Sequence, residues 1–171
     1  MDKYNINEAL YKNIPIVFRN VFPITPYWND FILHLNHAMM QPEEGARPEI
    51  NDTIGFAHFW ARLTATIDHA EKWFPQIKIV HEHINQIHSV GAYGAFSVIS
   101  FTSTEKTTGN HKDPVDIFYW QCIGNVEWHF SEIGVSHSLT PGDIIFVPGG
   151  LMHEIKSKTP RAAISFTCNK K

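Results

Sequence analysis

The sequence predicts a mainly β domain with an N-terminal helical section, in which short antiparallel strands form a sandwich or barrel. Up to about Gly91, apolar residues recur mainly at helical steps, whereas beyond it their period shifts toward two. Turns rich in glycine, proline and asparagine separate the segments of the second half, and no helical pattern lies between them. Seven short strands at this spacing are typical of antiparallel sandwiches and barrels, and one strand from the N-terminal half would complete eight.

The N-terminal section is predicted to hold one short strand and three helices. The first apolar run has its proline near the start, as an edge strand can. Thr25-Pro26 is typical of a helix N-cap followed by proline in the first turn. Ile67 and Ala70 continue a spacing of three and four residues that begins at Trp60. These patterns predict a strand at 13–19, a helix from Thr25 to about Met40, a loop at 41–51, a helix at about 53–73 and a helix from Pro75 to Gly91.

Beyond Gly91 the chain is rich in the β-branched and aromatic residues that favour strands. We expect a single domain over residues 1–171, with the largely helical section at about 1–91 and the barrel core at about 92–171. The predicted strands of that core are 95–101, 116–123, 126–130, 135–139, 144–147, 153–155 and 162–167.

Composition excludes several classes of function. With 171 residues, of which 43% are apolar, the chain can bury one substantial core. A net charge of −3, a sequence pI near 6.4 and the lack of a Lys/Arg cluster argue against a nucleic-acid partner. No run approaches the roughly 18 apolar residues of a membrane span, and the N-terminus lacks the apolar core of a secretory signal. Cys122 and Cys168, in apolar strand-like contexts, do not suggest a disulfide, so we expect a cytoplasmic protein.

Two fragments about forty residues apart carry the main functional prediction. His111 and Asp113 are two residues apart, so in an extended segment their side chains point to the same side. His153 follows a glycine- and proline-containing run that predicts two short strands joined by a tight turn. Each fragment taken alone fits a surface loop or a core histidine better than a metal ligand. Together, two imidazoles and one carboxylate form the ligand set that holds a ferrous ion on one face and leaves the opposite positions open.

The spacing around the second histidine resembles a known motif. Gly142-x5-Pro148-x-Gly150-x2-His153 matches the second sequence motif of the cupin superfamily. That motif usually ends with an asparagine, where this chain has Ser157. The glycines allow tight turns where strands cross at the mouth of a barrel, and the proline fixes the entry angle of the histidine strand.

The first fragment extends the resemblance to one branch of that superfamily. His111-x-Asp113, followed by Gln121-x2-Gly124 and Trp128, resembles the JmjC-like, cupin-type iron and 2-oxoglutarate hydroxylases, and the run 14–22 is similar to their N-terminal strand. The resemblance implies a double-stranded β-helix, or jelly-roll, barrel. It also implies Fe(II) held by His111, Asp113 and His153, with 2-oxoglutarate as cosubstrate for the hydroxylation of an unidentified small-molecule or peptide substrate.

The resemblance also indicates where the distal carboxylate of 2-oxoglutarate would bind. Many cupin-type hydroxylases place a lysine two residues beyond the Gln-x2-Gly glycine, and this chain has Val126 there. Thr108 matches a family position whose hydroxyl meets that carboxylate. Arg161 is the substitute cation that we expect, because its spacing from His153 resembles that of prolyl-hydroxylase-type oxygenases and its fork suits a carboxylate. Ser165, four residues further on, falls on the same strand face as Arg161 and can assist.

Two other functions stay open at this point. A cupin metalloenzyme that does not use 2-oxoglutarate is favoured by Val126. A non-catalytic cupin that binds a ligand or partner is the other, with the helices as an interaction surface that can also pair two subunits into a homodimer.

The remaining histidines and aromatic residues are more ambiguous. Two imidazoles two residues apart on a helix lie about 200° apart and cannot share one ion, which sets one HxH pair aside. A pair three apart on a helix face has no third ligand nearby, and two histidines on barrel strands can add a ligand or line the cavity. In the order just described, these pairs are His81 and His83, His34 and His37, and His129 and His137. Phe118 and Trp120 share one strand face and Tyr119 takes the other, but parity does not say which face looks into the barrel.

Overall fold

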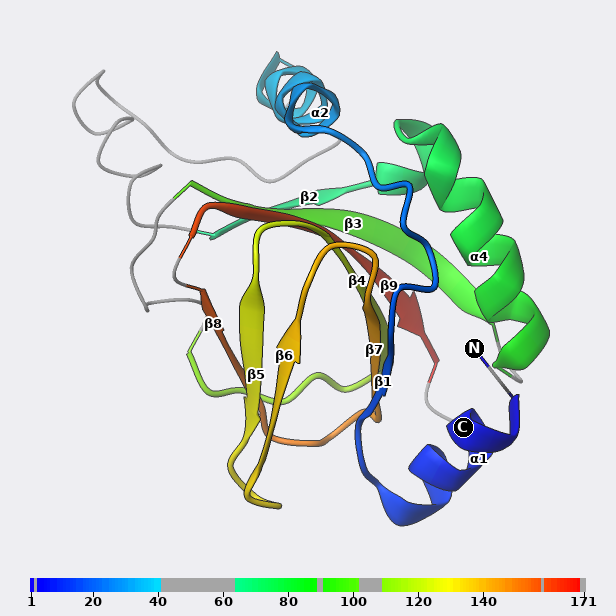
Figure 1. Ribbon diagram of the computed structural model, residues 1–171. Helices are drawn as coiled ribbons and strands as arrows, with labels where there is room; N and C mark the ends of the chain where they lie inside the picture. Colours follow the sequence, from blue (N-terminus) through cyan, green and yellow to red (C-terminus); the bar gives the residue numbers. More distant parts are fainter. Residues whose placement is uncertain (2, 41–63, 89–90, 102–108, 158, 170–171) are drawn as a thin grey trace.

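Two antiparallel sheets make up most of the computed structural model, which describes residues 1, 3–40, 64–88, 91–101, 109–157 and 159–169 (Figure 1). The large sheet has six strands in the order β1-β7-β4-β9-β3-β2, and the small sheet has three in the order β6-β5-β8. This is the predicted mainly β, double-stranded β-helix (jelly-roll) barrel. The strands are β1 Ile16–Phe18, β2 Thr64–Asp68, β3 Ala92–Ser100, β4 Asp116–Ile123, β5 Val126–Phe130, β6 Val135–Leu139, β7 Ile144–Val147, β8 Glu154–Ser157 and β9 Arg161–Cys168.

The predicted strands of the second half are confirmed, four of them to the residue. β4, β5, β6 and β7 have the predicted bounds, whereas β3, β8 and β9 differ from theirs by one to three residues at one or both ends. Gly124 allows the tight connection between β4 and β5. It has φ +74°, and a Cβ atom there would lie 2.3 Å from the carbonyl oxygen of Pro160. Only glycine fits both the left-handed backbone and the missing space.

The helices lie on the large sheet. They are α1 Lys3–Lys12, α2 Trp28–Met40 and α4 Pro75–Ile87, and a 3-10 turn, η1, spans Ala70–Lys72. Figure 1 shows α2 and α4 over the β2–β3 end of that sheet, on the side away from the small sheet. α4 buries the apolar stripe that its spacing predicts, namely Ile77, Val80, Ile84 and Ile87. Among the described residues, no helix has the length and apolar character needed to cross a membrane.

The predicted helix at about 53–73 is wrong where the structure describes it. Residues 64–68 form β2, which pairs antiparallel with β3 from Thr64↔Ser100 to Asp68↔Phe96. The pairing with β3 overrides the helical spacing, because Ile67 and Ala70 bury their side chains in the same core from a strand and from η1. Two strands therefore come from the N-terminal half, where one was expected, and both are edge strands. The predicted loop at 41–51 and residues 53–63 lie outside the described residues.

Two helix boundaries also differ from the prediction, and one helix was not predicted. α2 begins at Trp28, and the carboxylate of Asp30 accepts the backbone N–H of Tyr27 (2.8 Å), so Asp30 caps the first turn in place of Thr25. α4 ends at Ile87, four residues before Gly91. α1 was missed, although its C-terminal end carries a stop signal: Asn13 has φ +51° just after the helix, and Pro15 follows two residues later.

The large sheet separates two apolar cores. Phe118 and Trp120 pack on the helical side, with side chains from α4. Tyr119, between them on β4, faces the space between the sheets, where Trp128 and Ile145 also lie. This assignment answers the question that strand parity left open. The Tyr119 hydroxyl is therefore on the barrel side of β4.

The buried His34 joins α2 to the large sheet in its neutral form. Its Nδ1 lies 3.1 Å from the Ser97 hydroxyl and its Nε2 lies 3.2 Å from the carbonyl oxygen of Asp68. Burial is the main reason that the pKa of His34 falls to about 4. A ring that accepts from Ser97 and donates to Asp68 is fully hydrogen-bonded without a second proton.

We expect His34 to make the free energy of unfolding decrease as pH falls from about 6.5 to about 4. In that interval the unfolded chain binds the proton and the folded protein does not, at a cost of about 1.4 kcal/mol per pH unit, with no further loss below it. His34→Gln keeps a donor and an acceptor but does not titrate, so its urea-denaturation midpoint should fall less steeply over this interval. His129→Gln, at a partly exposed histidine that is not among the influences on the pKa of His34, is the control. Equal slopes for wild type and His34→Gln would contradict the assignment.

Candidate metal centre

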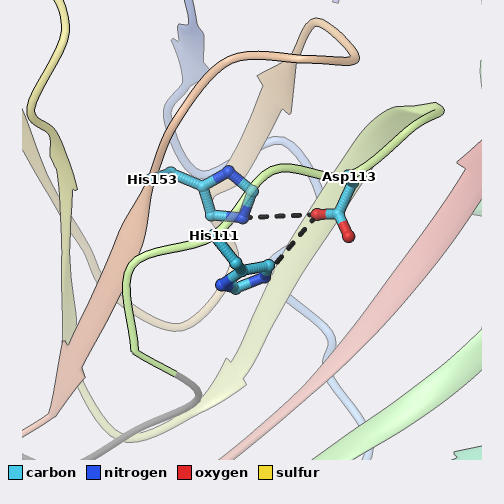
Figure 2. A group of neighbouring side chains, drawn as sticks. All are labelled: His111, Asp113 and His153. Carbon is cyan, nitrogen blue, oxygen red and sulfur yellow. Dashed lines mark ion pairs between the residues drawn. The ribbon is translucent and has the colours of Figure 1, made fainter.

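The three predicted metal ligands meet at one end of the barrel. Figure 2 shows both imidazoles directed at the Asp113 carboxylate. His153 Nε2 lies 3.3 Å and His111 Nε2 lies 3.8 Å from Asp113 Oδ2, and one ligand atom from each residue falls within 4.8 Å of the others. Two ligands ~2.1 Å from an ion and at right angles to each other lie roughly 3 Å apart. The three side chains are therefore close enough to one another to hold one ion.

Backbone pairing brings these residues together from distant parts of the sequence. His111 and His153 form an isolated antiparallel bridge, in which each backbone N–H donates to the carbonyl oxygen of the other (2.9 Å for both bonds). One step along, the N–H of Gly150 donates to the carbonyl oxygen of Asp113 (2.7 Å). The HxD segment is thus paired with the segment that enters β8, and the two imidazole rings lie 4.4 Å apart.

A hydrogen bond from Nδ1 fixes the orientation of each imidazole ring. Nδ1 of His111 donates to the carbonyl oxygen of Gly109 (2.9 Å), and Nδ1 of His153 donates to that of Leu151 (3.0 Å). A carbonyl can only accept, so Nδ1 carries the proton and Nε2 is the atom offered to the centre. Metal-binding histidines typically hold their second nitrogen in this way.

The carboxylate at the centre is in its charged form. When Nε2 of His153 also carries a proton, its hydrogen bond is the largest influence on the pKa of Asp113, and it lowers that pKa against the opposing effect of burial. The charges of His153 and His111 lower it further. Two Nε2 lone pairs facing a carboxylate repel it unless a proton or a metal ion lies between them, so this donor set suits a cation.

A cavity of about 200 Å³ connects the triad to the interior of the barrel. Its polar groups come from the triad and, further in, from Tyr119, Arg161 and Ser165, with Thr66 on β2. The rest of its wall is apolar and comes from both sheets: Phe96, Val98, Ile117, Trp128 and Ile155. Metal ligands and a second polar cluster therefore share one largely apolar pocket.

Arg161 is a buried cation in this pocket. It is 1% exposed, and its Nη1 donates to the hydroxyl of Tyr119 (2.7 Å). Its Nε is buried without a hydrogen-bond partner, and no carboxylate of the described residues forms an ion pair with it. Burial raises the pKa of Tyr119, so that the phenol is neutral and cannot balance the charge. A buried, uncompensated guanidinium is costly, and an anionic ligand would offset that cost.

The predicted cosubstrate contacts have different outcomes. Arg161 and Ser165 line the same cavity as the triad, which is the placement expected of them. Thr108 lies outside the described residues. Val126 is buried in the core between the sheets and offers no polar group. Tyr119 was missed as a polar contact, because its strand parity did not say which way it faced.

The spare histidines do not join the centre. Among the described residues, the triad is the only group of three potential ligands close enough to hold a metal ion. His81 lies on α4, as predicted, and its Nε2 donates to the carbonyl oxygen of Ala92 (2.8 Å). His129 accepts a hydrogen bond from Ser136 (2.8 Å) on β6, and neither His129 nor His137 lines the cavity.

Comparison with solved structures identifies the fold. The chain matches a structure of YcfD from Escherichia coli with a TM-score of 0.73 at 14% identity, over 100% of this chain and 54% of that one. Structures of the same protein, described as a ribosomal oxygenase, in complex with cobalt and 2-oxoglutarate or with cobalt and succinic acid match with TM-scores of 0.67. The chain spans about half the length of these structures. No protein-family model and no curated protein matches it. The predicted resemblance to cupin-type oxygenases is therefore confirmed for the fold.

Divalent metal ions should stabilise the folded protein through the triad. A ligand at 100 times its Kd that binds only the folded state adds about 2.7 kcal/mol, or roughly 5–10 °C in Tm for a chain of this size. We expect this shift with Fe(II), Mn(II) or Co(II) in differential scanning fluorimetry, and its loss in His111→Ala. His129→Ala removes a histidine outside the triad and should retain it. A wild-type Tm that ignores all three ions would contradict the site.

Proposed function

We propose that the chain is an Fe(II)- and 2-oxoglutarate-dependent oxygenase that hydroxylates a small-molecule or peptide substrate. One observation carries the proposal: an ionised aspartate with two imidazoles faces the same cavity as a buried arginine that has no carboxylate partner among the described residues. The first group suits a ferrous ion and the second suits a dianionic cosubstrate. The common fold with an oxygenase crystallised with cobalt and 2-oxoglutarate supports this reading.

The triad would hold the metal ion, and other residues of the pocket would bind the cosubstrate. His111, Asp113 and His153 would hold the ion from one face and leave its other positions for 2-oxoglutarate and dioxygen. When bound, iron and 2-oxoglutarate supply an oxidative decarboxylation that yields succinate and carbon dioxide and delivers one oxygen atom of dioxygen to a substrate C–H bond.

At the inner end of the pocket, the distal carboxylate would meet Arg161. The guanidinium offers a charged donor, and the hydroxyls of Tyr119 and Ser165 lie on the same cavity wall. The apolar walls keep water out, which strengthens the attraction between the guanidinium and the carboxylate. Arg161 would thus take the role of the lysine that many cupin-type hydroxylases have at the position of Val126.

A second candidate is a cupin metalloenzyme that does not use 2-oxoglutarate. The observation in its favour is the burial of Val126 in the apolar core, since no cation stands at the usual position. In that case Arg161 would bind an anionic group of the substrate itself.

Binding of 2-oxoglutarate separates the two candidates. Adding 2-oxoglutarate to the anaerobic Fe(II) protein should produce a weak visible metal-to-ligand charge-transfer band, and air should then yield succinate. Arg161→Ala removes a buried charged partner, which typically costs about 2–5 kcal/mol, so the Kd for 2-oxoglutarate should rise about 30-fold or more. Tyr119→Phe removes only a hydroxyl and should cost less.

The same variants also provide the controls for this experiment. Arg161→Ala keeps all three metal ligands, so its Tm shift with Fe(II) should match that of wild type. A charge-transfer band that forms with the same Kd in Arg161→Ala would assign the cosubstrate site elsewhere. Metal binding without any band or succinate would favour the second candidate, and no metal binding at all would favour a non-catalytic ligand-binding protein.

A further inference from the structure

A buried His–Asp pair lies behind the metal centre, outside the cavity. His88 follows the last turn of α4, and Asp116 is the first residue of β4. His88 Nε2 donates to Asp116 Oδ2 (3.1 Å), and both side chains have no exposed surface. The rings of Phe118 and Phe146 flank the imidazole. Replacing such a buried pair with apolar residues is often neutral or stabilising, so stability alone does not explain it.

The second oxygen of Asp116 reaches the segment that carries His153. Asp116 Oδ1 accepts the backbone N–H of Gly149 (2.7 Å), a short hydrogen bond to a charged acceptor. A Cβ atom on Gly149 would lie 2.9 Å from the backbone carbon of Val115, so the turn rests directly on the chain between Asp113 and Asp116. The absence of a side chain at Gly149 is what permits this close approach.

Three successive links therefore hold the two ligand segments together. The outermost is the bridge between His111 and His153, and the next is the bond from Gly150 N–H to the carbonyl oxygen of Asp113. The bond from Gly149 to Asp116 is the innermost, and it is the only one of the three made by a side chain. The length of this link depends on where the Asp116 carboxylate sits, and His88 holds that carboxylate from α4.

We propose that His88 and Asp116 are positioning residues that set the spacing between Asp113 and His153. The pair anchors the Pro148–Gly150 turn to the start of β4 and connects the metal centre to the helical layer. The inference rests on the proposed metal site, and neither residue contacts the ion. Groups that orient metal ligands from outside typically contribute 10- to 100-fold to metal affinity.

Cobalt(II) binding tests this directly, followed by the visible absorption bands of the ion and by titration for Kd. Asp116→Ala removes both hydrogen bonds, and we expect a 10- to 100-fold higher Kd together with altered band positions, because the ligand geometry changes. Asp116→Asn can still accept from Gly149 through its amide oxygen, and its amide N–H can donate to Nε2 of His88 when the ring proton moves to Nδ1, so it should restore the wild-type bands and most of the affinity. Val80→Ala truncates a buried residue of α4 in the same core and should lower stability without changing either readout.

His88→Leu provides a second, independent variant. It keeps Asp116 and its bond to Gly149 and removes only the anchor from α4, so it should raise the Kd about 10-fold. If Asp116→Ala does not fold, His88→Leu decides the matter alone. Unchanged Kd and bands in the folded variants would overturn the positioning role while leaving the metal site intact. A wild-type protein that does not bind cobalt would overturn the metal site itself.

Discussion

The backbone bridge between His111 and His153 is the contact on which the candidate site depends. The HxD segment enters β4 of the large sheet and His153 leads into β8 of the small sheet, so the bridge joins the two sheets at the mouth of the barrel. The two backbone hydrogen bonds of this bridge each have an N–O distance of 2.9 Å. They fix both backbones, so the imidazoles can move only by rotation about their side-chain bonds. Their Nδ1 bonds to backbone carbonyls remove most of that. The triad is therefore formed by folding, before any ion is bound.

Folding also positions the charged groups of the pocket before any ligand binds. The centre presents a carboxylate with two ring nitrogens. At the other end, Arg161 presents a guanidinium, and its Nη1 donates to the neutral phenol of Tyr119. Among the described residues, no lysine or arginine forms an ion pair with Asp113, and no carboxylate forms one with Arg161. A ferrous ion would offset the first deficit and a distal carboxylate the second. The two deficits together carry the functional proposal better than either alone, since an isolated buried arginine or an isolated triad has many other uses.

The strands of the barrel could be predicted from local spacing, and the triad could be predicted because its two motifs resemble those of cupin-type hydroxylases. Period-two segments bounded by glycine and proline fix the strands, and Gly142 to His153 fixes the turn that positions the second histidine. What the sequence prediction missed depends on distant partners. β2 shows helical spacing yet pairs with β3, and the side of the sheet that Tyr119 faces follows from where the helices pack. The hydrogen bond from Asp116 to Gly149 also joins residues 33 positions apart. No local pattern encodes such a contact.

The cavity is polar at both ends, and the triad is more exposed than Arg161. The side chains of His111 and Asp113 are 36% and 29% exposed, whereas that of His153 is 2% exposed and Arg161 is almost fully buried. In the proposed binding mode, the distal carboxylate of 2-oxoglutarate would lie deep between the sheets at Arg161, and its metal-facing end would lie nearer to solvent. A substrate bound afterwards would meet the centre from the side of His111 and Asp113. This gradient of exposure favours the proposed anchoring cation on β9, deep between the sheets, over one on the half-exposed HxD segment.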